Sequence, residues 1–305
     1  MRVPLLLAIT LTASLVSCAG TGPLPDDTFA VERIAGFDSW LLSVTPNGRS
    51  FGFYLYLPED YDESASYPMV VYLQGWGNFG REPNPALLSS GPLSPLYHAG
   101  MLDPARRGQL DSRIRASIVV APRLPFYDPS YQNPQGYYDP DTLDSVVRFV
   151  MTNYRADASR LYITGLSEGG GGTWAYAWRH TEKVAAIVPI CAWLAYPMKD
   201  ELKILPVWNL QCFDDPVVPH AVGGDATLQK VTGVANVLQG YPANSNNYTI
   251  SYSAETGLGN WTLGVGPPTG TYTYTLYATG GHDAWTRTYA NPDVWAWLFG
   301  QSKPQ

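Results

Sequence analysis

The sequence contains few of the residues on which metal sites and disulfide frameworks depend. Its 305 residues include three cysteines and four histidines, and none of these has the close, repeated spacing of a metal site. Charged residues make up 15% of the chain, the formal net charge is −7, and no run rich in Lys or Arg occurs. We therefore predict no metal, no cofactor and no nucleic-acid partner.

Long apolar runs are also missing, apart from a short one at the N-terminus. A positive start at Arg2 precedes an apolar stretch over residues 3–16, which ends in the small residues 17–20. This is the layout of a signal peptide, and the stretch is too short and too interrupted by Thr and Ser for a membrane span. We therefore predict that the protein is exported.

The end of this stretch, residues 15–18, resembles a bacterial lipobox. In such a site the cysteine is acylated and becomes the mature N-terminus, and several acyl chains on one residue give stable anchoring. We predict a signal peptide over residues 1–18, a tether over residues 19–28, and an outer-membrane or cell-surface lipoprotein that contacts the membrane only through Cys18. Ordinary cleavage nearby, which would give a secreted or periplasmic protein, is the alternative.

The residues around Ser167 carry the strongest functional signal. Apolar residues 161–163 run as a strand into residues 165–169, which match G-x-S-x-G, and a helix-like run follows over residues 172–180. Strand, motif and helix together indicate a nucleophile elbow, because a sharp turn exposes the serine to a base and a substrate. The first N–H groups of the helix, that of Glu168 among them, would face a developing oxyanion. A glycine-rich loop that holds a serine by chance is the alternative.

An acid and a histidine follow this serine in the order Ser, Asp, His that alpha/beta hydrolases use. An apolar strand over residues 206–212 precedes Asp214 and Asp215, and acids at the carboxyl ends of parallel strands are where such sheets place functional groups. The run D-P-V-V-P begins at Asp215, so we favour Asp215 as the triad acid and keep Asp214 as the alternative. Both would also suit an ordinary turn.

His282 is the histidine that fits this order. It lies in a loop near the C-terminus, after a strand-like stretch over residues 272–277. Its imidazole would accept the Ser167 proton and later protonate the leaving group, while Asp215 would hold the imidazole in the required tautomer. The histidines that do not fit, because they precede or closely follow the serine or directly follow the acid, are His98, His180 and His220.

A second oxyanion donor is expected in the loop after an early strand. Residues 67–73 read as a buried strand, and the glycine-rich residues 74–80 follow it. Glycines there would let the chain fold back over the nucleophile, and the N–H of Trp76 is the predicted donor beside that of Glu168. One such donor lowers the barrier by about 3 kcal/mol. A turn of purely structural use is the alternative.

These stretches resemble the esterase and polyhydroxybutyrate-depolymerase-like branch of the alpha/beta hydrolases, which includes feruloyl- and acetyl-esterase-like enzymes and proteins labelled predicted peptidases. The resemblance implies the alpha/beta-hydrolase fold and a Ser-Asp-His triad. The sequence departs from the family at Gln74, where the family has His, and at Glu168, where Met or Gln is common; residues 240–271 resemble an insertion. The residues that carry the resemblance are 56–61, 70–80, 160–174, 187–191, 215–219 and 281–285.

Strand-like and helix-like segments alternate along the chain, which predicts the α/β class. We expect a mostly parallel central sheet with helices on both faces, and an antiparallel N-terminal hairpin around residues 46–48. Helices are expected over residues 141–154 and 291–299. Residues 29–305 are predicted to form one catalytic domain.

Two further cysteines, Cys191 and Cys212, lie near the carboxyl ends of predicted strands. Those strands are expected to be neighbours, so an exported protein could join the two residues in a disulfide. Two buried free thiols are the alternative, and we favour it.

The motifs together predict a serine carboxylic-ester hydrolase that acts through an acyl-enzyme on small, carbohydrate-linked or polymeric esters. An ester substrate is the only ligand implied, and we expect a monomer. A serine peptidase on the same triad and a non-catalytic glycan-binding lipoprotein are the alternatives.

Overall fold

A computed structural model of the chain describes residues 30–34, 37–42, 51–58, 60–75, 111–122, 138–224, 226–227, 230, 247–253, 258–263 and 272–303. Several predicted features lie outside the described residues. They are the signal peptide and tether over residues 1–28, the hairpin turn at residues 46–48, and Trp76.

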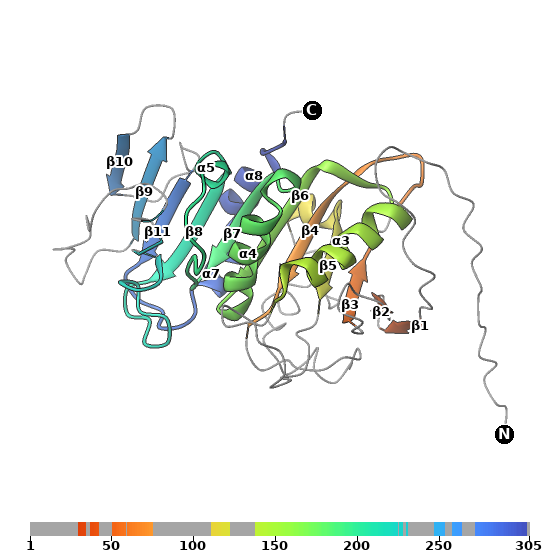
Figure 1. Cartoon of the computed structure of the whole chain (residues 1–305), viewed down its shortest axis with the longest axis horizontal. Coiled ribbons are helices and arrows are strands. Elements are labelled where there is room, and N and C mark those ends of the chain that lie inside the picture. The colour runs from red at the N-terminus through yellow and green to blue at the C-terminus, as the bar shows by residue number, and fades with distance from the viewer. Residues whose placement is uncertain are drawn as a thin grey trace, which may run out of the picture.

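The described strands form one sheet with the order β1-β2-β3-β5-β4-β6-β7-β8-β11-β9-β10 (Figure 1). Every pairing from β5 through β4, β6, β7 and β8 to β11 is parallel. The pairings at both ends are antiparallel. The strands are β1 (Ala30–Ile34), β2 (Phe37–Leu42), β3 (Phe51–Tyr56), β4 (Tyr67–Leu73), β5 (Ile118–Pro122), β6 (Ala156–Leu166), β7 (Ala186–Ile190), β8 (Val207–Cys212), β9 (Asn247–Ser253), β10 (Leu258–Leu263) and β11 (Tyr272–Tyr277).

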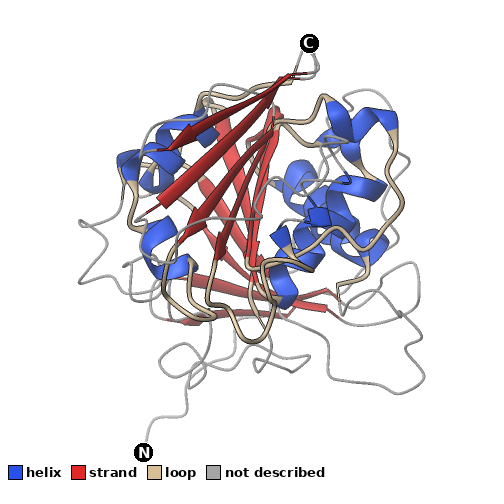
Figure 2. Ribbon diagram, turned by 90° about the vertical axis from the view of Figure 1, so that its left-hand side faces the viewer, coloured by secondary structure: helices blue, strands red, loops and turns tan. Residues whose placement is uncertain are grey.

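Helices cover both faces of this sheet (Figure 2). Helices α3 and α4 lie on one face, and α7 and α8 lie on the other (Figure 1). The predicted alpha/beta-hydrolase architecture, with its parallel centre and antiparallel N-terminal strands, is therefore confirmed. No helix within the described ranges has the length and apolar character needed to cross a bilayer. The helices are α2 (Ser112–Arg115), α3 (Pro140–Asn153), α4 (Glu168–Arg179), the 3-10 helix η3 (Thr181–Lys183), α5 (Asp200–Lys203), α7 (Trp285–Tyr289) and α8 (Pro292–Phe299).

Strand β4 shows how the sequence supplies two cores, one on each face. Alternate side chains of a strand point to opposite faces. Met69, Val71 and Leu73 accordingly pack into the core with α3 and α4, and Val70 and Tyr72 into the core with α8. All five are buried, which is why a strand covered on both faces reads as a continuous apolar run.

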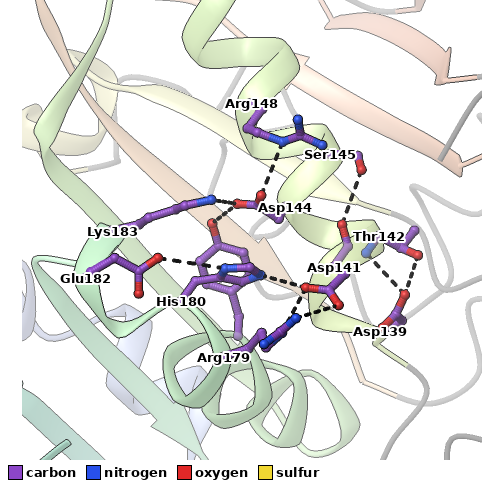
Figure 3. Close-up of polar contacts among 11 residues, drawn as sticks. Asp139, Asp141, Thr142, Asp144, Ser145, Arg148, Arg179, His180, Glu182 and Lys183 are labelled. Atoms are coloured by element: carbon purple, nitrogen blue, oxygen red, sulfur yellow. Dashed lines mark hydrogen bonds and ion pairs between the residues drawn. The ribbon is translucent and has the colours of Figure 1, made fainter. Parts of the chain in front are cut away.

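A buried carboxylate on α3 joins this helix to α4 and η3 (Figure 3). Asp144 accepts hydrogen bonds from Lys183 Nζ at 2.6 Å and from Tyr176 Oη at 3.0 Å. Its other oxygen lies 3.2 Å from Nε of Arg148. A buried charge is tolerated only when it is paired and hydrogen-bonded, so these contacts fix the position of α3 against the helix that follows the serine motif.

The structure describes both the helix after Ser167 and part of the segment that is predicted as an insertion. Helix α4 begins at Glu168, four residues earlier than the sequence run that starts at residue 172 predicts. Within residues 240–271, strands β9 and β10 form an antiparallel pair. Strand β9 also pairs with β11, so this pair is continuous with the main sheet. This part of the chain therefore extends the sheet at its edge.

Candidate active site

Ser167 occupies the sharp turn between β6 and α4. Its backbone has φ 53 and ψ −120, a combination that costs a residue with a Cβ atom about 1–3 kcal/mol. Its N–H donates to the carbonyl of Ile190 at 2.9 Å, so the end of β7 holds the turn. The side chain stands at the carboxyl end of the parallel strands, where sheets of this class place reacting groups.

The glycines in the first turn of α4 allow this turn to pack closely against β4 and Tyr138. A Cβ atom on Gly169 would overlap the carbonyl of Leu73 in β4, and one on Gly172 would lie 2.6 Å from the ring of Tyr138. The close packing that the turn requires therefore excludes side chains here. Glycine lowers helix propensity by about 1 kcal/mol per residue, which is why the first turn of α4 is weakly marked in the sequence.

His282 connects the serine to an acid through its two ring nitrogens. Its Nε2 lies 2.8 Å from Ser167 Oγ. Its Nδ1 lies 2.8 Å from Oδ2 and 3.0 Å from Oδ1 of Asp215. The ring of Trp285 packs edge-to-face on the imidazole, with 5.3 Å between the ring centroids. The structure thus brings together the three residues that the sequence predicts as a triad.

Asp215 follows β8, and its side chain is fully buried. Oδ1 accepts the N–H groups of Val217 and Val218, both at 2.9 Å, and Oδ2 accepts Nε2 of Gln211 at 3.0 Å. Hydrogen bonds from these three donors fix the orientation of the carboxyl group. Asp215 is therefore held as an oriented acceptor for the imidazole.

Asp214 has a different set of contacts. Its carboxylate accepts the N–H of Gly280 at 3.2 Å and that of Gly281 at 2.8 Å. Both glycines have positive φ angles, of 145 and 59, which residues with side chains rarely adopt. Asp214 thus supports the turn that precedes His282, and Asp215 is the acid placed against the imidazole.

The predicted oxyanion loop runs beside the nucleophile as far as the structure describes it. A Cβ atom on Gly75 would lie 3.4 Å from that of Ser167, so the chain after β4 passes directly over the turn. Trp76, the predicted donor, lies outside the described residues. The N–H of Glu168, the other predicted donor, belongs to the first residue of α4, directly after Ser167.

A tyrosine fixes the start of this loop. Tyr138 is buried, and its hydroxyl donates to the Gln74 carbonyl at 3.2 Å. Burial raises the pKa of Tyr138 well above its usual value, so the hydroxyl stays protonated and remains a donor. The hydrogen bond therefore orients the peptide between Gln74 and Gly75.

Among the described residues, one group of three side chains has the composition of a metal site. Ligand atoms of Cys191, Asp215 and His282 all lie within 4.8 Å of one another. The imidazole and the carboxylate already use these atoms to contact each other and Ser167. This arrangement matches a histidine oriented by an acid rather than a set of metal ligands.

Several residues of the site carry no signal in the sequence. Gln211, Tyr138 and Cys191 come close to the proposed triad or its loop only through the fold. Cys191 and Cys212 are both free and buried. The structure therefore has two free thiols, as the favoured interpretation of the sequence predicts, and no disulfide between Cys191 and Cys212.

The chain resembles known esterases in sequence and in structure. No family model matches it. It is 25% identical over 214 residues to a protein of Aspergillus terreus named probable feruloyl esterase C, and this match covers 70% of the chain and 67% of the fungal protein. This match to a fungal protein supports the resemblance to the esterase branch of the alpha/beta hydrolases that the sequence predicts.

Two solved structures extend this comparison. A thermostable esterase superimposes with a TM-score of 0.62 at 25% identity, and the match covers 88% of this chain. The chain spans 64% of the length of that esterase. A ferulic acid esterase superimposes with a TM-score of 0.50 at 15% identity, over 90% of this chain and 97% of that one. The second likeness concerns the fold alone.

Proposed function

We propose that this chain, which has the alpha/beta-hydrolase fold and resembles its esterase group, is a serine carboxylic-ester hydrolase. The observation that carries the proposal is the continuous hydrogen-bonded chain from Ser167 through His282 to Asp215, with 2.8 Å between the atoms at each step. A serine hydroxyl is a weak nucleophile until a base accepts its proton, and this geometry supplies the base. The esterases to which the chain is similar support the same reaction class.

In the acylation step, Ser167 Oγ attacks the ester carbonyl while its proton passes to Nε2 of His282. The buried Asp215 carboxylate stabilises the imidazolium that forms. The tetrahedral intermediate collapses when Nε2 gives the proton to the leaving alcohol oxygen. The products of this step are the free alcohol and an acyl group bonded to Oγ.

Deacylation repeats the same proton transfers with water. His282 accepts a proton from the attacking water, and a second tetrahedral intermediate releases the acid and restores the Ser167 hydroxyl. The N–H of Glu168, at the start of α4, and that of Trp76 are proposed to stabilise the oxyanion in both steps. Each donor contributes about 3 kcal/mol to the lowering of the barrier.

Hydrolysis of a graded ester series tests this proposal. The full chain should hydrolyse p-nitrophenyl acetate and its longer-chain homologues, and Ser167→Ala should lose the catalysed rate. Ser159→Ala is the matched control, because Ser159 lies on the same strand β6 with its hydroxyl bonded to Asp157. It should retain the wild-type rate. Equal rates in wild type and Ser167→Ala, or no hydrolysis by either, would refute the proposal.

The same assay can also identify the class of ester that the protein hydrolyses. We propose small, carbohydrate-linked or polymeric esters, and the name of the fungal relative adds methyl ferulate to the series. Amide analogues separate the esterase from a serine peptidase on the same triad. We expect turnover of esters and none of amides; preferred amide cleavage would identify a peptidase.

We further propose that the protein is exported and lipid-anchored at Cys18, on the basis of the lipobox-like residues 15–18. Expression of the full chain with radiolabelled palmitate tests this. Wild type should incorporate label and sediment with membranes, whereas Cys18→Ser should do neither. A wild-type protein that is unlabelled and free in the medium would instead support ordinary secretion.

A further inference from the structure

Strand β8 carries two amide side chains where a covered strand usually has apolar ones. Asn209 and Gln211 are both fully buried, and because they are two residues apart they point to the same face of the sheet. Val207, on that face, packs into the core with α3 and α4. A buried amide costs free energy unless it is hydrogen-bonded, so the partners of each amide indicate why it is there.

The amide of Gln211 contacts both the acid of the proposed triad and the loop that holds this acid. Its Nε2 donates to Oδ2 of Asp215 at 3.0 Å and to the carbonyl of Val218 at 2.6 Å. The N–H of Val218 donates in turn to Oδ1 of Asp215 at 2.9 Å. These three hydrogen bonds form a closed ring that joins the end of β8, the following loop and both oxygens of the carboxylate.

Only one orientation of the Gln211 amide is compatible with this ring. Both partners of Nε2 are acceptors, because a carboxylate and a backbone carbonyl have no proton to donate. The amide oxygen Oε1 is buried and has no hydrogen-bond partner among the described residues. The position therefore uses the two donors of the amide and leaves its acceptor unused.

We propose that Gln211 is a positioning residue for the proton transfer: one amide proton holds Oδ2 of Asp215, and the other ties this bond to the loop after β8. Oδ2 is the oxygen that lies 2.8 Å from Nδ1 of His282, so the Gln211 amide fixes the acceptor that the imidazole meets. A neutral donor also leaves the negative charge of the acid available to stabilise the imidazolium. This inference rests on the proposed function, because the positioning matters only if His282 transfers a proton.

Loss of the amide should loosen the carboxylate without removing it. Gln211→Met keeps a side chain of similar length and size but has no N–H to donate. Oδ1 of Asp215 would keep the N–H groups of Val217 and Val218, whereas Oδ2 would keep only the imidazole. The acid and the imidazole would then adopt the productive geometry for a smaller fraction of the time, and turnover depends on that geometry.

Asn209→Leu is the matched control for this variant. It also removes a buried amide from the same face of β8, but Nδ2 of Asn209 donates to Oη of Tyr272 at 3.2 Å rather than to the acid. The two variants therefore share the cost of losing a buried amide and differ in whether the carboxylate of Asp215 loses a donor. Circular dichroism and thermal unfolding of both variants establish that the comparison is between folded proteins.

Proton NMR of the His282 ring tests the positioning without any need for turnover. A proton held between an imidazole nitrogen and a carboxylate resonates far downfield of other N–H protons, because its hydrogen bond is short and charge-assisted. We expect such a resonance from wild type, and its absence in His282→Ala assigns it to Nδ1. In Gln211→Met the resonance should move upfield or broaden through faster exchange with water, and in Asn209→Leu it should stay in place. An unchanged resonance in Gln211→Met would overturn the proposal.

Steady-state kinetics with the same variants test the consequence for turnover. Gln211→Met should lower kcat about tenfold, the loss of one hydrogen bond to a charged group, and leave KM within about twofold of wild type. Asn209→Leu should keep the wild-type kcat. Equal kcat for wild type and Gln211→Met, or an equal loss of kcat in Gln211→Met and Asn209→Leu, would overturn the positioning role.

Gln211→Glu is a second variant, with the shape of the native side chain, and it tests the requirement for two donors. The new carboxyl group offers at most one proton to the two acceptors, and once ionised it offers none and places a like charge beside Asp215. The ratio of its kcat to that of wild type should therefore fall as the pH rises. A kcat equal to that of wild type at every pH would overturn the proposal.

The NMR and kinetic measurements separate this inference from the proposed function. If wild type hydrolyses esters, and Gln211→Met has the wild-type resonance and the wild-type kcat, the inference is refuted and the esterase stands. If the resonance moves in Gln211→Met but wild type hydrolyses no ester, the esterase is refuted, and the hold of the amide on the acid is supported.

Discussion

Asp214 and Asp215 are neighbours in the sequence, yet their carboxylates hold different parts of the site. Asp215 lies 2.8 Å from Nδ1 of His282, whereas Asp214 accepts the N–H groups of the two glycines before that histidine. One acid thus orients the imidazole, and the other orients the turn from which it projects. Two like charges can sit side by side here because Asp214 is exposed and Asp215 is buried among donors.

Asparagine substitutions should separate these two roles. Asp215→Asn keeps the shape but presents an amide to the imidazole, and it should lower kcat by about 10⁴-fold through the wrong histidine tautomer. Asp214→Asn keeps one carbonyl acceptor for the glycine turn and should lower kcat about tenfold or less. Ester hydrolysis at saturating substrate measures both effects. The larger loss in Asp214→Asn would mean that the acid is misassigned.

Alanine substitutions in the first turn of α4 should have opposite effects on stability. Gly169→Ala would push a methyl group into the Leu73 carbonyl and should cost about 3 kcal/mol or more, together with activity. A methyl group on Gly171 would meet no atom within 4 Å, so Gly171→Ala should raise the free energy of unfolding by about 0.5–1 kcal/mol. Thermal unfolding of both variants tests this pair, and a stabilised Gly169→Ala would contradict the close packing.

The buried carboxylate of α3 should matter for stability and leave the chemistry unaffected. Asp144→Asn leaves Lys183 and Arg148 without their counter-charge, and it should lower the free energy of unfolding by about 2 kcal/mol. The cost is below that of a fully buried pair because the Lys183 side chain is 35% exposed. Urea denaturation measures this change, while kcat of the folded variant should stay within about twofold of wild type. A free energy of unfolding equal to that of wild type would show that the contacts of Asp144 in Figure 3 make no net contribution to stability.

The two buried thiols should be unreactive in the folded protein. Burial raises the pKa of Cys191 well above its usual value and that of Cys212 to about 12. The thiolate is the reactive form, so at neutral pH its fraction is very small and rises only as the pH approaches these raised values. Iodoacetamide followed by peptide mass mapping should label both residues in denaturant and neither in native protein at neutral pH. Rapid native labelling of either residue would contradict its burial.

The sequence predicts the sheet well where both faces are covered. Residues 67–73 read as a buried strand and form β4 over the same bounds. The expected strand over residues 272–277 likewise matches β11. The nearly continuous apolar run of β4 and the β-branched and aromatic residues of β11 are typical of strands inside a covered sheet, so the local sequence indicates both elements.

Packing decides what the sequence leaves open. Asp214 and Asp215 follow the same strand, and the D-P-V-V-P run that favours Asp215 leaves Asp214 as an alternative. Only the fold decides which of the two side chains meets His282. The first turn of α4 is weakly marked in the sequence, because its glycines meet the packing needs of β4 and Tyr138 at the expense of helix propensity. The thiol of Cys191 reads as an ordinary buried cysteine, because the sequence does not show that its neighbours include an acid and a histidine loop. The catalytic roles themselves, and the part of Trp76, stay predictions.

The parallel pairing of β11 with β8 has a consequence for when the proposed triad can form. Ser167 and His282 are 115 residues apart, and the histidine loop reaches the serine only after β11 has docked beside β8. Contacts between such distant segments form late, because the entropy of closing the long loop must be overcome first. During synthesis the turn at Ser167 emerges well before His282, so the proposed triad can form only after the chain through His282 has left the ribosome. Recovery of ester hydrolysis after dilution from denaturant would therefore report the last step of folding, whereas circular dichroism would report earlier ones.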